Sequence, residues 1–314
     1  MPIKVFNSVL EYLPLNISKI VQQQESWRNG EIIEIRLRVN QPLQLISFKD
    51  EQFILESGSP FIVTKDDLER AFMILSKNSL YAIERQLAEG YLTISGGHRV
   101  GFTGQAVIEG GNLKTIKNIN SLNYRITREL IGVAQKVIKK IYNFEYDLYY
   151  NTLIIAPPLC GKTSLLRDII RLISDGDQKN QIKGKKVAVV DERSEIAGAY
   201  NGIAQNKIGS RTDLLDNCPK AEGMMLLIRS MSPEVIAVDE IGRDRDVEAI
   251  QEAVNSGVSV VTTVHGRDLK TIAYRPSIKK LIDIKAFERY IVLSKRKGIG
   301  TIEKILDVNG KEVV

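Results

Sequence analysis

The second half of the chain alternates short apolar runs with segments of helical spacing. Runs rich in Val, Ile and Ala predict strands buried on both faces, and the segments between them repeat apolar residues at helical intervals. This alternation predicts an α/β architecture, in which a mainly parallel sheet carries helices on both faces. A closing hairpin is expected at 286–294 and 301–307, across the turn that begins at Lys295. The buried strands are expected at 151–155, 186–191, 235–239 and 258–264.

The first half has a mixed pattern. Residues 31–38 alternate polar and apolar side chains like a half-buried strand, and Thr64 resembles the cap of a helix over 68–75. We therefore expect a smaller α+β domain over residues 1–145, followed by the α/β domain over 146–314. The further strands expected in the first half are 43–48, 52–56, 91–94, 99–102, 105–109 and 122–126, and the further helices are 5–13, 80–88 and 132–142.

The junction after strand 151–155 carries a phosphate-binding motif. The run 156–163 matches G-x-x-x-x-G-K-[ST] except at its first position, where Ala156 replaces glycine and requires a negative φ. In such a loop backbone N–H groups cradle phosphates, Lys162 reaches the β- and γ-phosphates, and the Thr163 hydroxyl binds Mg²⁺. The expected cofactors are therefore ATP and Mg²⁺. The residues expected to contact the nucleotide are Pro157, Pro158, Leu159, Cys160, Gly161, Lys162, Thr163 and Ser164.

Acidic residues follow two of the other predicted strands. Strand 235–239 ends in Asp239 and Glu240, which are suited to hold Mg²⁺ and to orient an attacking water, respectively. Strand 186–191 is followed by Glu192, a second candidate for the general base, and by Arg193, which could pair with it. We expect strand 186–191 to lie beside the phosphate-loop strand. The residues alone do not choose between Glu240 and Glu192, because the choice depends on the distance to the attacking water.

The chain has two histidines. His265 follows strand 258–264 and is placed to sense the γ-phosphate, which makes it a catalytic candidate. His98 lies in a glycine-rich turn of the first domain, where a structural role and a contact role are equally compatible with the sequence. A site of this type also needs a positive charge opposite the γ-phosphate, which a neighbouring subunit can supply. The candidates for that charge are Arg99, Arg125 and Arg229.

Charge and cysteine content indicate which partners and which cellular compartment suit this chain. From Arg275 to Lys304 there are nine Lys and Arg residues against three Asp and Glu residues, and this surplus of six equals the chain's net charge of +6. Such a basic region suits an acidic partner, anionic lipid or nucleic acid, or is simply a solvated surface. Two cysteines, Cys160 and Cys218, fit a reducing compartment. No apolar run approaches the roughly 18 residues that span a bilayer, so we expect a cytoplasmic protein that contacts membranes peripherally.

These motifs occur in the order found in a known superfamily. The phosphate loop 156–163, the acidic box 191–193, the acidic strand end 235–240 and the histidine box 263–266 together resemble the secretion ATPases of type II and type IV systems and pilus motors. Leu159, where another glycine is expected, and Ser164, where Thr is usual, depart from that pattern. A sporulation family within the superfamily is resembled by the runs 34–38, 96–101, 157–163, 191–195 and 231–235.

The resemblance implies a RecA-like P-loop core and an ATP-hydrolysing motor or assembly ATPase. It also implies a ring-shaped homo-oligomer, a hexamer, with nucleotide held between the two domains and at subunit boundaries. The implied partner is a membrane-embedded, secretion-like complex that links mother cell and forespore during endospore formation, with this protein on the mother-cell side.

Two other functions keep the same fold. One is a nucleic-acid-associated ATPase, which predicts binding that weakens steeply with salt. The first half has no recognisable nucleic-acid module and aromatic residues make up only 6% of the chain, so nucleic acid is not the expected partner. The other is a nucleotide-gated scaffold that binds ATP and assembles but hydrolyses little of it.

Overall fold

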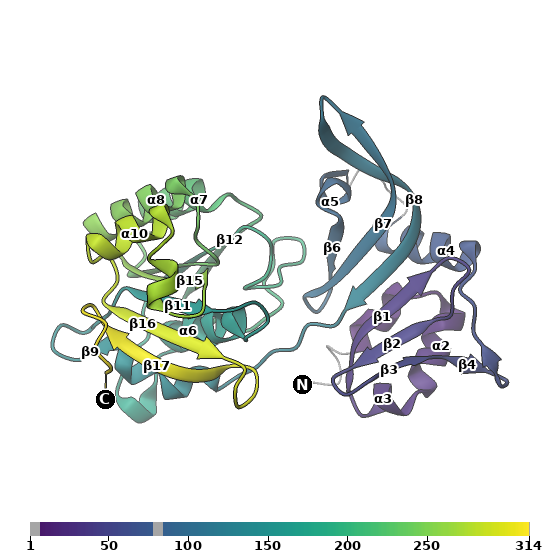
Figure 1. Cartoon of the computed structure of the whole chain (residues 1–314), viewed down its shortest axis with the longest axis horizontal. Coiled ribbons are helices and arrows are strands. Elements are labelled where there is room, and N and C mark those ends of the chain that lie inside the picture. The colour runs from purple at the N-terminus through teal and green to yellow at the C-terminus, as the bar shows by residue number, and fades with distance from the viewer. Residues whose placement is uncertain (1–6, 78–83, 314) are drawn as a thin grey trace. The chain divides into compact units, whose positions relative to one another are not determined.

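The computed structural model describes residues 7–77 and 84–313. The chain divides into two compact units, residues 1–128 and 129–314. Each unit has its own hydrophobic core, and the second unit has one on each face of its sheet. Figure 1 shows the first unit in purple to blue and the second in teal to yellow.

The first unit is built on an antiparallel sheet. Its described strands pair in the order β3-β2-β1-β8-β7-β6, and every neighbouring pair is antiparallel. The strand expected at 31–38 is β1, whose apolar residues Ile32, Ile35 and Leu37 are fully buried. The strands of this unit are β1 (Ile32–Arg38), β2 (Gln44–Ser47), β3 (Glu51–Phe53), the small pair β4 (Leu55–Glu56) and β5 (Ser59–Pro60), β6 (Tyr91–Ile94), β7 (His98–Glu109) and β8 (Asn112–Arg125).

Helices cover this sheet, and the helix expected after Thr64 begins at that cap. The Thr64 hydroxyl accepts the Asp67 N–H, and the Asp67 carboxylate accepts the Thr64 N–H, which makes a capping box. The helix expected at 5–13 is a 3₁₀ segment over Ser8–Tyr12, with residues 5 and 6 outside the described part, and the helix expected at 80–88 has residues 80–83 outside it. The helical elements are η1 (Ser8–Tyr12), α2 (Leu15–Gln23), α3 (Glu25–Arg28), α4 (Lys65–Ser76) and α5 (Glu84–Glu89).

Two strands expected separately, 99–102 and 105–109, are one strand, β7. The register against β8 shifts between Thr103 and Gln105, so Gly104 sits at a bulge. A Cβ at Gly104 would lie 2.5 Å from the Lys117 carbonyl oxygen and 2.9 Å from that of Asn118. Glycine therefore lets the two backbones approach and keeps the strand continuous through the bulge.

The second unit holds a mainly parallel sheet. Seven strands of the described chain pair in the order β13-β12-β14-β15-β11-β16-β17, and only the last pair is antiparallel. The sheet strands are β11 (Thr152–Ala156), β12 (Val187–Asp191), β13 (Thr212–Asp216), β14 (Val235–Val238), β15 (Ser259–His265), β16 (Arg289–Ser294) and β17 (Thr301–Asp307), and a separate pair is β9 (Tyr142–Asn143) and β10 (Leu148–Tyr149).

Helices pack on both faces of this sheet. Side chains alternate along β11, so that Ile154 and Ala156 join the core under α6, while Leu153 and Ile155 join the core under α7, α8 and α10. Figure 1 shows these two layers of helices on either side of the strands. The helical elements are η3 (Val133–Lys136), η4 (Ile138–Ile141), α6 (Lys162–Asp175), η5 (Gln178–Asn180), α7 (Lys220–Met231), α8 (Asp244–Asn255), α9 (Leu269–Ile272) and α10 (Pro276–Asp283).

The strand order differs from the sequence expectation in one respect. β12, which corresponds to the expected strand 186–191, does not lie beside β11, because β14 and β15 pair between them. All four strands are apolar runs buried on both faces. Their amino-acid composition therefore does not indicate which of them pair with each other. The sequence analysis also missed β13, the edge strand, whose residues are only half-buried.

The domain boundary also moves. The helix expected at 132–142 consists of two 3₁₀ segments rich in β-branched residues, which favour the α-helix less. Ala134, Val137 and Ile141 are fully buried in the core that contains α6, and the Ala134 N–H donates to the Asp168 carboxylate at 2.7 Å. Residues 129–145 therefore belong to the second unit, and the boundary falls at residues 128–129 instead of 145.

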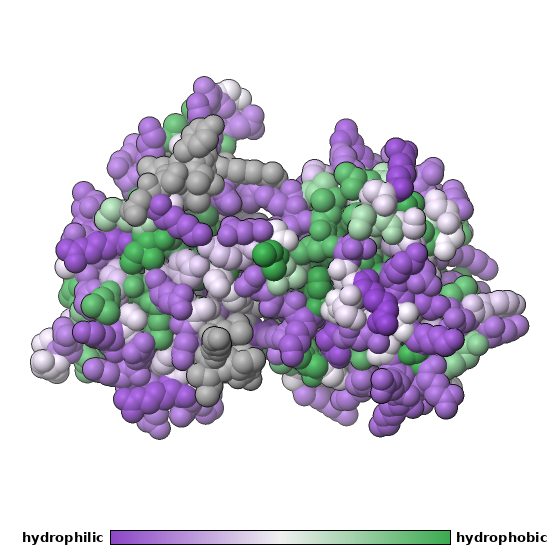
Figure 2. Space-filling view, turned by 180° about the vertical axis from the view of Figure 1, so that it is seen from behind, coloured by the Kyte–Doolittle hydropathy of each residue, from purple (hydrophilic) through white to green (hydrophobic). Residues whose placement is uncertain are grey.

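One face of the molecule is largely hydrophilic (Figure 2). Figure 2 shows polar side chains over most of the visible face, with smaller apolar areas between them. Within the described residues, no helix combines the length and the apolar character needed to cross a membrane.

The bulge at Gly104 gives a test of the first unit. We expect Gly104→Ala to lower the free energy of unfolding by about 1–3 kcal/mol, because its Cβ meets backbone atoms that cannot turn away. Gly101→Ala is the matched control, since the nearest atom to its Cβ is 3.9 Å away. Urea unfolding followed by the fluorescence of Trp27, the single tryptophan, measures both. Equal stability of the two variants would contradict the role of Gly104.

Candidate active site

The loop after β11 joins the carboxyl end of a buried strand to the start of a helix. Residues 157–161 connect β11 to α6, and Lys162, Thr163 and Ser164 form the first turn of the helix. Leu159 and Gly161 take φ of 58° and 81°. Ala156 is fully buried and lies outside the positive-φ region, so the replaced glycine demands no special conformation there. The positive φ occurs instead at Leu159, which is the other position where this loop has a different residue from the expected glycine.

The start of α6 favours an anion. The first N–H groups of an α-helix have no acceptor within the helix, and the helix dipole adds positive potential at that end. Cys160 is buried beneath the loop, while Pro158 and Leu159 are exposed above it. The loop thus offers donors to solvent at the point where a phosphate group would bind.

Three of the predicted residues meet beside this loop. The Nζ atom of Lys162 lies 3.6 Å from Oε2 of Glu240, and Nε2 of His265 lies 3.1 Å from the same oxygen. Lys162 is buried, whereas the side chains of Glu240 and His265 are 42% and 35% exposed. The Nδ1 atom of His265 is buried and has no hydrogen-bond partner among the described residues. A buried cation and an imidazole therefore contact the same carboxylate oxygen.

Parallel pairing explains this meeting. β11 is flanked by β15, and β15 by β14, so the loop, His265 and Glu240 all lie at carboxyl ends of neighbouring strands. In the register of β11 and β15, Ala156 lies opposite His265, and the Gly266 N–H donates to the Ala156 carbonyl at 3.1 Å. The histidine is thus fixed at the first position of the loop.

Asp239 is held beside this group by β15. Its Oδ1 accepts the Thr263 hydroxyl at 2.9 Å and the N–H of Glu240 at 2.8 Å. Among the described residues no cluster of three or more His, Cys, Asp or Glu side chains could hold a metal ion unaided. Mg²⁺ usually keeps several waters and takes one or two protein ligands plus substrate phosphates, so a magnesium site does not require such a cluster.

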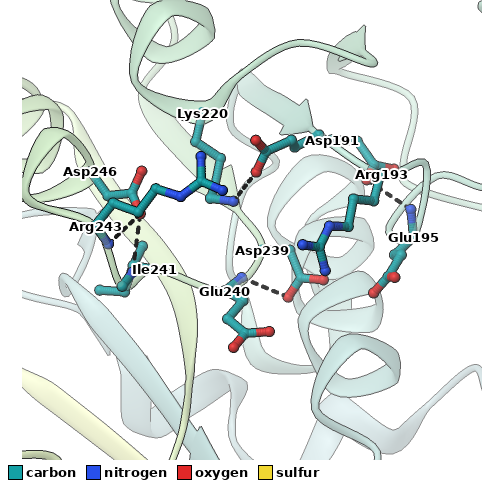
Figure 3. A pocket seen from close by; sticks show the side chains of 11 residues that line it. Asp191, Arg193, Glu195, Lys220, Asp239, Glu240, Ile241, Arg243 and Asp246 are labelled. Carbon is teal, nitrogen blue, oxygen red and sulfur yellow. Dashed lines mark hydrogen bonds and ion pairs between the residues drawn. The ribbon is translucent and has the colours of Figure 1, made fainter. Parts of the chain in front are cut away.

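Glu192 lies apart from the three. It follows β12, beyond β14, and its carboxylate pairs with Nζ of Lys220 at the start of α7. A polar cavity of about 190 Å³ separates the two acidic strand ends, and Asp239 and Glu240 also line it. Figure 3 shows Arg193 reaching toward Asp239 within this cavity and Lys220 on its far side.

Comparison with known proteins identifies the family of this chain. Residues 5–313 match the model of the family described as sporulation stage III, protein AA. The chain is 44% identical to the stage III sporulation protein AA of Bacillus subtilis over 304 residues, which are 97% of this chain and 96% of that protein. The chain belongs to the sporulation stage III protein AA family.

Solved structures show the fold that this family member shares. The ATPase DotB of Legionella pneumophila matches with a TM-score of 0.58 at 18% identity, over 89% of this chain and 76% of that one. The pilus retraction motor PilT with bound ADP matches with a TM-score of 0.55 at 16% identity, over 90% and 77%. The second unit is therefore a RecA-like P-loop core, as the sequence predicted.

The remaining candidates lie elsewhere. In the first unit Arg99 stacks on the Tyr91 ring at 4.2 Å from its centroid, and it pairs in register with Arg125, which is exposed. Arg229 lies near the end of α7, five residues before Glu234 of the loop that enters β14, and so toward the amino end of that strand. His98 is fully buried, and its Nδ1 accepts the Thr127 N–H at 3.1 Å, which favours the structural role.

The sequence analysis missed the hydrogen bonds that hold the acidic box, residues 191–193, in place. The buried Asp191 carboxylate accepts the N–H groups of residues 195–197 at 2.8–2.9 Å. Burial raises the pKa of Asp191 to about 6, although the bonds from Ala197 and Glu195 act in the opposite direction. From α6, Arg167 donates to the carbonyls of Glu195 and Ile196. The only signal in the sequence was a charged Arg-Asp pair among apolar helical positions.

Arg167 therefore connects the phosphate-loop helix to the acidic box. It is buried, and burial lowers its pKa, while Asp191 and Asp239 are among the acids whose charges oppose this shift. Removing its charge would leave two carbonyls without donors and these carboxyls without a nearby cation. Asp191 of the acidic box thus accepts hydrogen bonds from residues 195–197, and Arg167 holds that same segment from α6.

We expect Arg167→Met to lower the free energy of unfolding by about 3 kcal/mol, which is typical of a buried charged group that leaves its partners unpaired. Arg245→Met is the control, because the Arg245 side chain is 81% exposed and pairs only loosely with Glu222 at 3.6 Å. Urea unfolding followed by far-ultraviolet circular dichroism measures both. A loss below 1 kcal/mol for Arg167→Met would show that the hydrogen bonds from Arg167 are dispensable.

Proposed function

We propose that this chain hydrolyses ATP and acts as a motor or assembly ATPase during endospore formation. The observation that carries the proposal is the meeting of Lys162, Glu240 and His265 beside a phosphate-type loop, within 3.6 and 3.1 Å. Membership of a sporulation family and a fold shared with secretion and pilus ATPases support it. Each of the three residues has a distinct part in the reaction.

Lys162 and the loop bind the phosphates. In the structure Lys162 contacts Glu240, and a triphosphate would compete for the same ammonium group with a larger charge. The first N–H groups of α6 add neutral donors that need no reorganisation. Binding of ATP would therefore transfer Lys162 from Glu240 to the phosphates and release the carboxylate to face the attacking water.

Glu240 is the general base in this proposal. His265 contacts its Oε2 and can hold the carboxylate in place while it accepts a proton from water. When the γ-phosphate leaves, His265 is the group positioned to register the change, since it lies opposite Ala156 at the start of the loop. Glu192 is less suited, because Lys220 neutralises it on the far side of the cavity.

Mg²⁺ would be held by the Thr163 hydroxyl and by Asp239, directly or through water. When bound, it neutralises charge that develops on the phosphate oxygens. The Thr263 hydroxyl fixes the orientation of Asp239 through its 2.9 Å bond. This support resembles the outer-shell hydrogen bonds that usually orient metal-binding carboxylates.

The working assembly in this proposal is a ring of identical subunits, a hexamer by family resemblance. It acts at the cytoplasmic face of a membrane-embedded, secretion-like complex. A ring would let a neighbouring subunit supply the missing positive charge, and Arg99 and Arg125, adjacent on the first unit's sheet, are the candidates.

Phosphate release tests the proposal. Lys162→Ala and Glu240→Gln should each reduce turnover by roughly 10²-fold or more, because each removes a group that acts on the reacting phosphate or water. Glu192→Gln should reduce it by less than about tenfold. An inactive Glu240→Gln that still binds ATP tightly would support Glu240 as the base.

Other results would point to another function. Unchanged release by Lys162→Ala would end the case for the phosphate loop. ATP binding without measurable release by the unmodified protein, alone and at high concentration, would favour the non-hydrolysing scaffold. Release stimulated by nucleic acid and suppressed by salt would favour the nucleic-acid-associated ATPase.

Sedimentation velocity tests the ring. We expect a non-hydrolysed ATP analogue to shift the protein to a ring-sized species, because nucleotide at a subunit boundary stabilises the assembly that binds it. Lys162→Ala should not show the shift. A persistent monomer that hydrolyses ATP at full rate would contradict the proposed ring.

A further inference from the structure

The turn between β16 and β17 lies against the phosphate loop. The Gly300 N–H donates to the Cys160 carbonyl at 3.1 Å. A Cβ placed on Gly161 would lie 3.1 Å from Cγ2 of Ile299 and 3.3 Å from Gly300. Gly161 therefore lacks a side chain at the point where this turn approaches, and the turn sits at the carboxyl end of the sheet beside the loop.

The turn is rigidly built. Arg296 folds back onto Glu303, with its Nη2 2.8 Å from Oε2. The Thr301 hydroxyl donates to the Gly298 carbonyl at 2.7 Å and accepts the Lys297 N–H at 3.3 Å. Ile299 nevertheless remains 64% exposed. An apolar side chain is thus held in solvent on a fixed support next to the loop.

The strand order sets the direction of a bound nucleotide. Glu240 and His265 lie on the β14 and β15 side of β11, so a terminal phosphate would point to that side. The nucleoside end must then leave the loop in the other direction. β16 is the neighbour of β11 on that side, and its turn with β17 is the structure found there.

We propose that the β16–β17 turn, residues 295–300, is the binding surface for the nucleoside of the nucleotide, with Ile299 contacting the flat face of the base. This inference rests on the proposed nucleotide site. Leu159, 76% exposed on the loop itself, is a second apolar side chain available to the nucleoside. A base contains a flat apolar face that gains from leaving water, and such contact does not depend on hydrogen-bond pattern. The turn would therefore bind purine nucleotides with little choice between them.

The test compares a ligand with a base to one without it. Titration calorimetry with Mg²⁺ and the full chain measures a non-hydrolysed ATP analogue, the corresponding GTP analogue and inorganic tripolyphosphate. Ile299→Ser should weaken the binding of both nucleotide analogues by roughly tenfold and leave the binding of tripolyphosphate unchanged, since only the apolar contact is lost. Ile203→Ser is the matched control, because Ile203 is 68% exposed on the distant loop between β12 and β13 and should change neither ligand class.

The outcomes separate this inference from the proposed function. If Lys162→Ala abolishes the binding of all three ligands while Ile299→Ser leaves all three affinities unchanged, the turn does not bind the nucleoside. The proposed phosphate site is then still supported. Equal weakening of analogue and tripolyphosphate by Ile299→Ser would show that the turn only shapes the loop, which also overturns the inference. Full binding of all ligands by Lys162→Ala would instead remove the proposed site.

Discussion

Parallel pairing of β11, β15 and β14 is the constraint on which the rest of the site depends. It places the carboxyl ends of three strands at one edge, and His265, Glu240 and the loop that contains Gly161 lie at those ends. The strands themselves are buried on both faces and offer no chemistry. Their role is to hold Lys162, Glu240 and His265 at distances that loops alone would not maintain.

This edge also gathers charge that must be balanced. Asp191, Asp239 and Glu240 follow neighbouring strands, and Asp216 and Asp239 are among the groups that raise the pKa of Asp191. The buried Arg167 and Lys162 provide the compensating positive charge from the same helix, α6. One helix therefore contributes both to the loop, through Lys162, and to the acidic box, through the bonds from Arg167 to the carbonyls of Glu195 and Ile196.

The sequence located the chemical groups better than it located the strands. The motifs placed Lys162, Glu240 and His265 at strand ends, which is where parallel sheets bring such groups together. They did not exclude Glu192, because the order of equally apolar strands depends on packing that no local pattern encodes. The half-buried β13 was missed because it lacks the continuous apolar run of a buried strand. Residues 132–142 were predicted as one helix, although their β-branched residues favour the α-helix less.

The departure at Leu159 has a physical consequence. A left-handed conformation costs an ordinary residue roughly 1–2 kcal/mol that glycine would avoid. Leu159 accepts this conformation and exposes 76% of its surface, so burial does not compensate for it. A side chain at this position also restricts the unfolded loop more than glycine does, which offsets part of that cost. The loop is consequently stiffer than a glycine-rich one, and the contact from Gly300 to Cys160 restrains it further. A stiff loop suits a site in which Lys162, rather than the backbone, makes the main movement when phosphate binds.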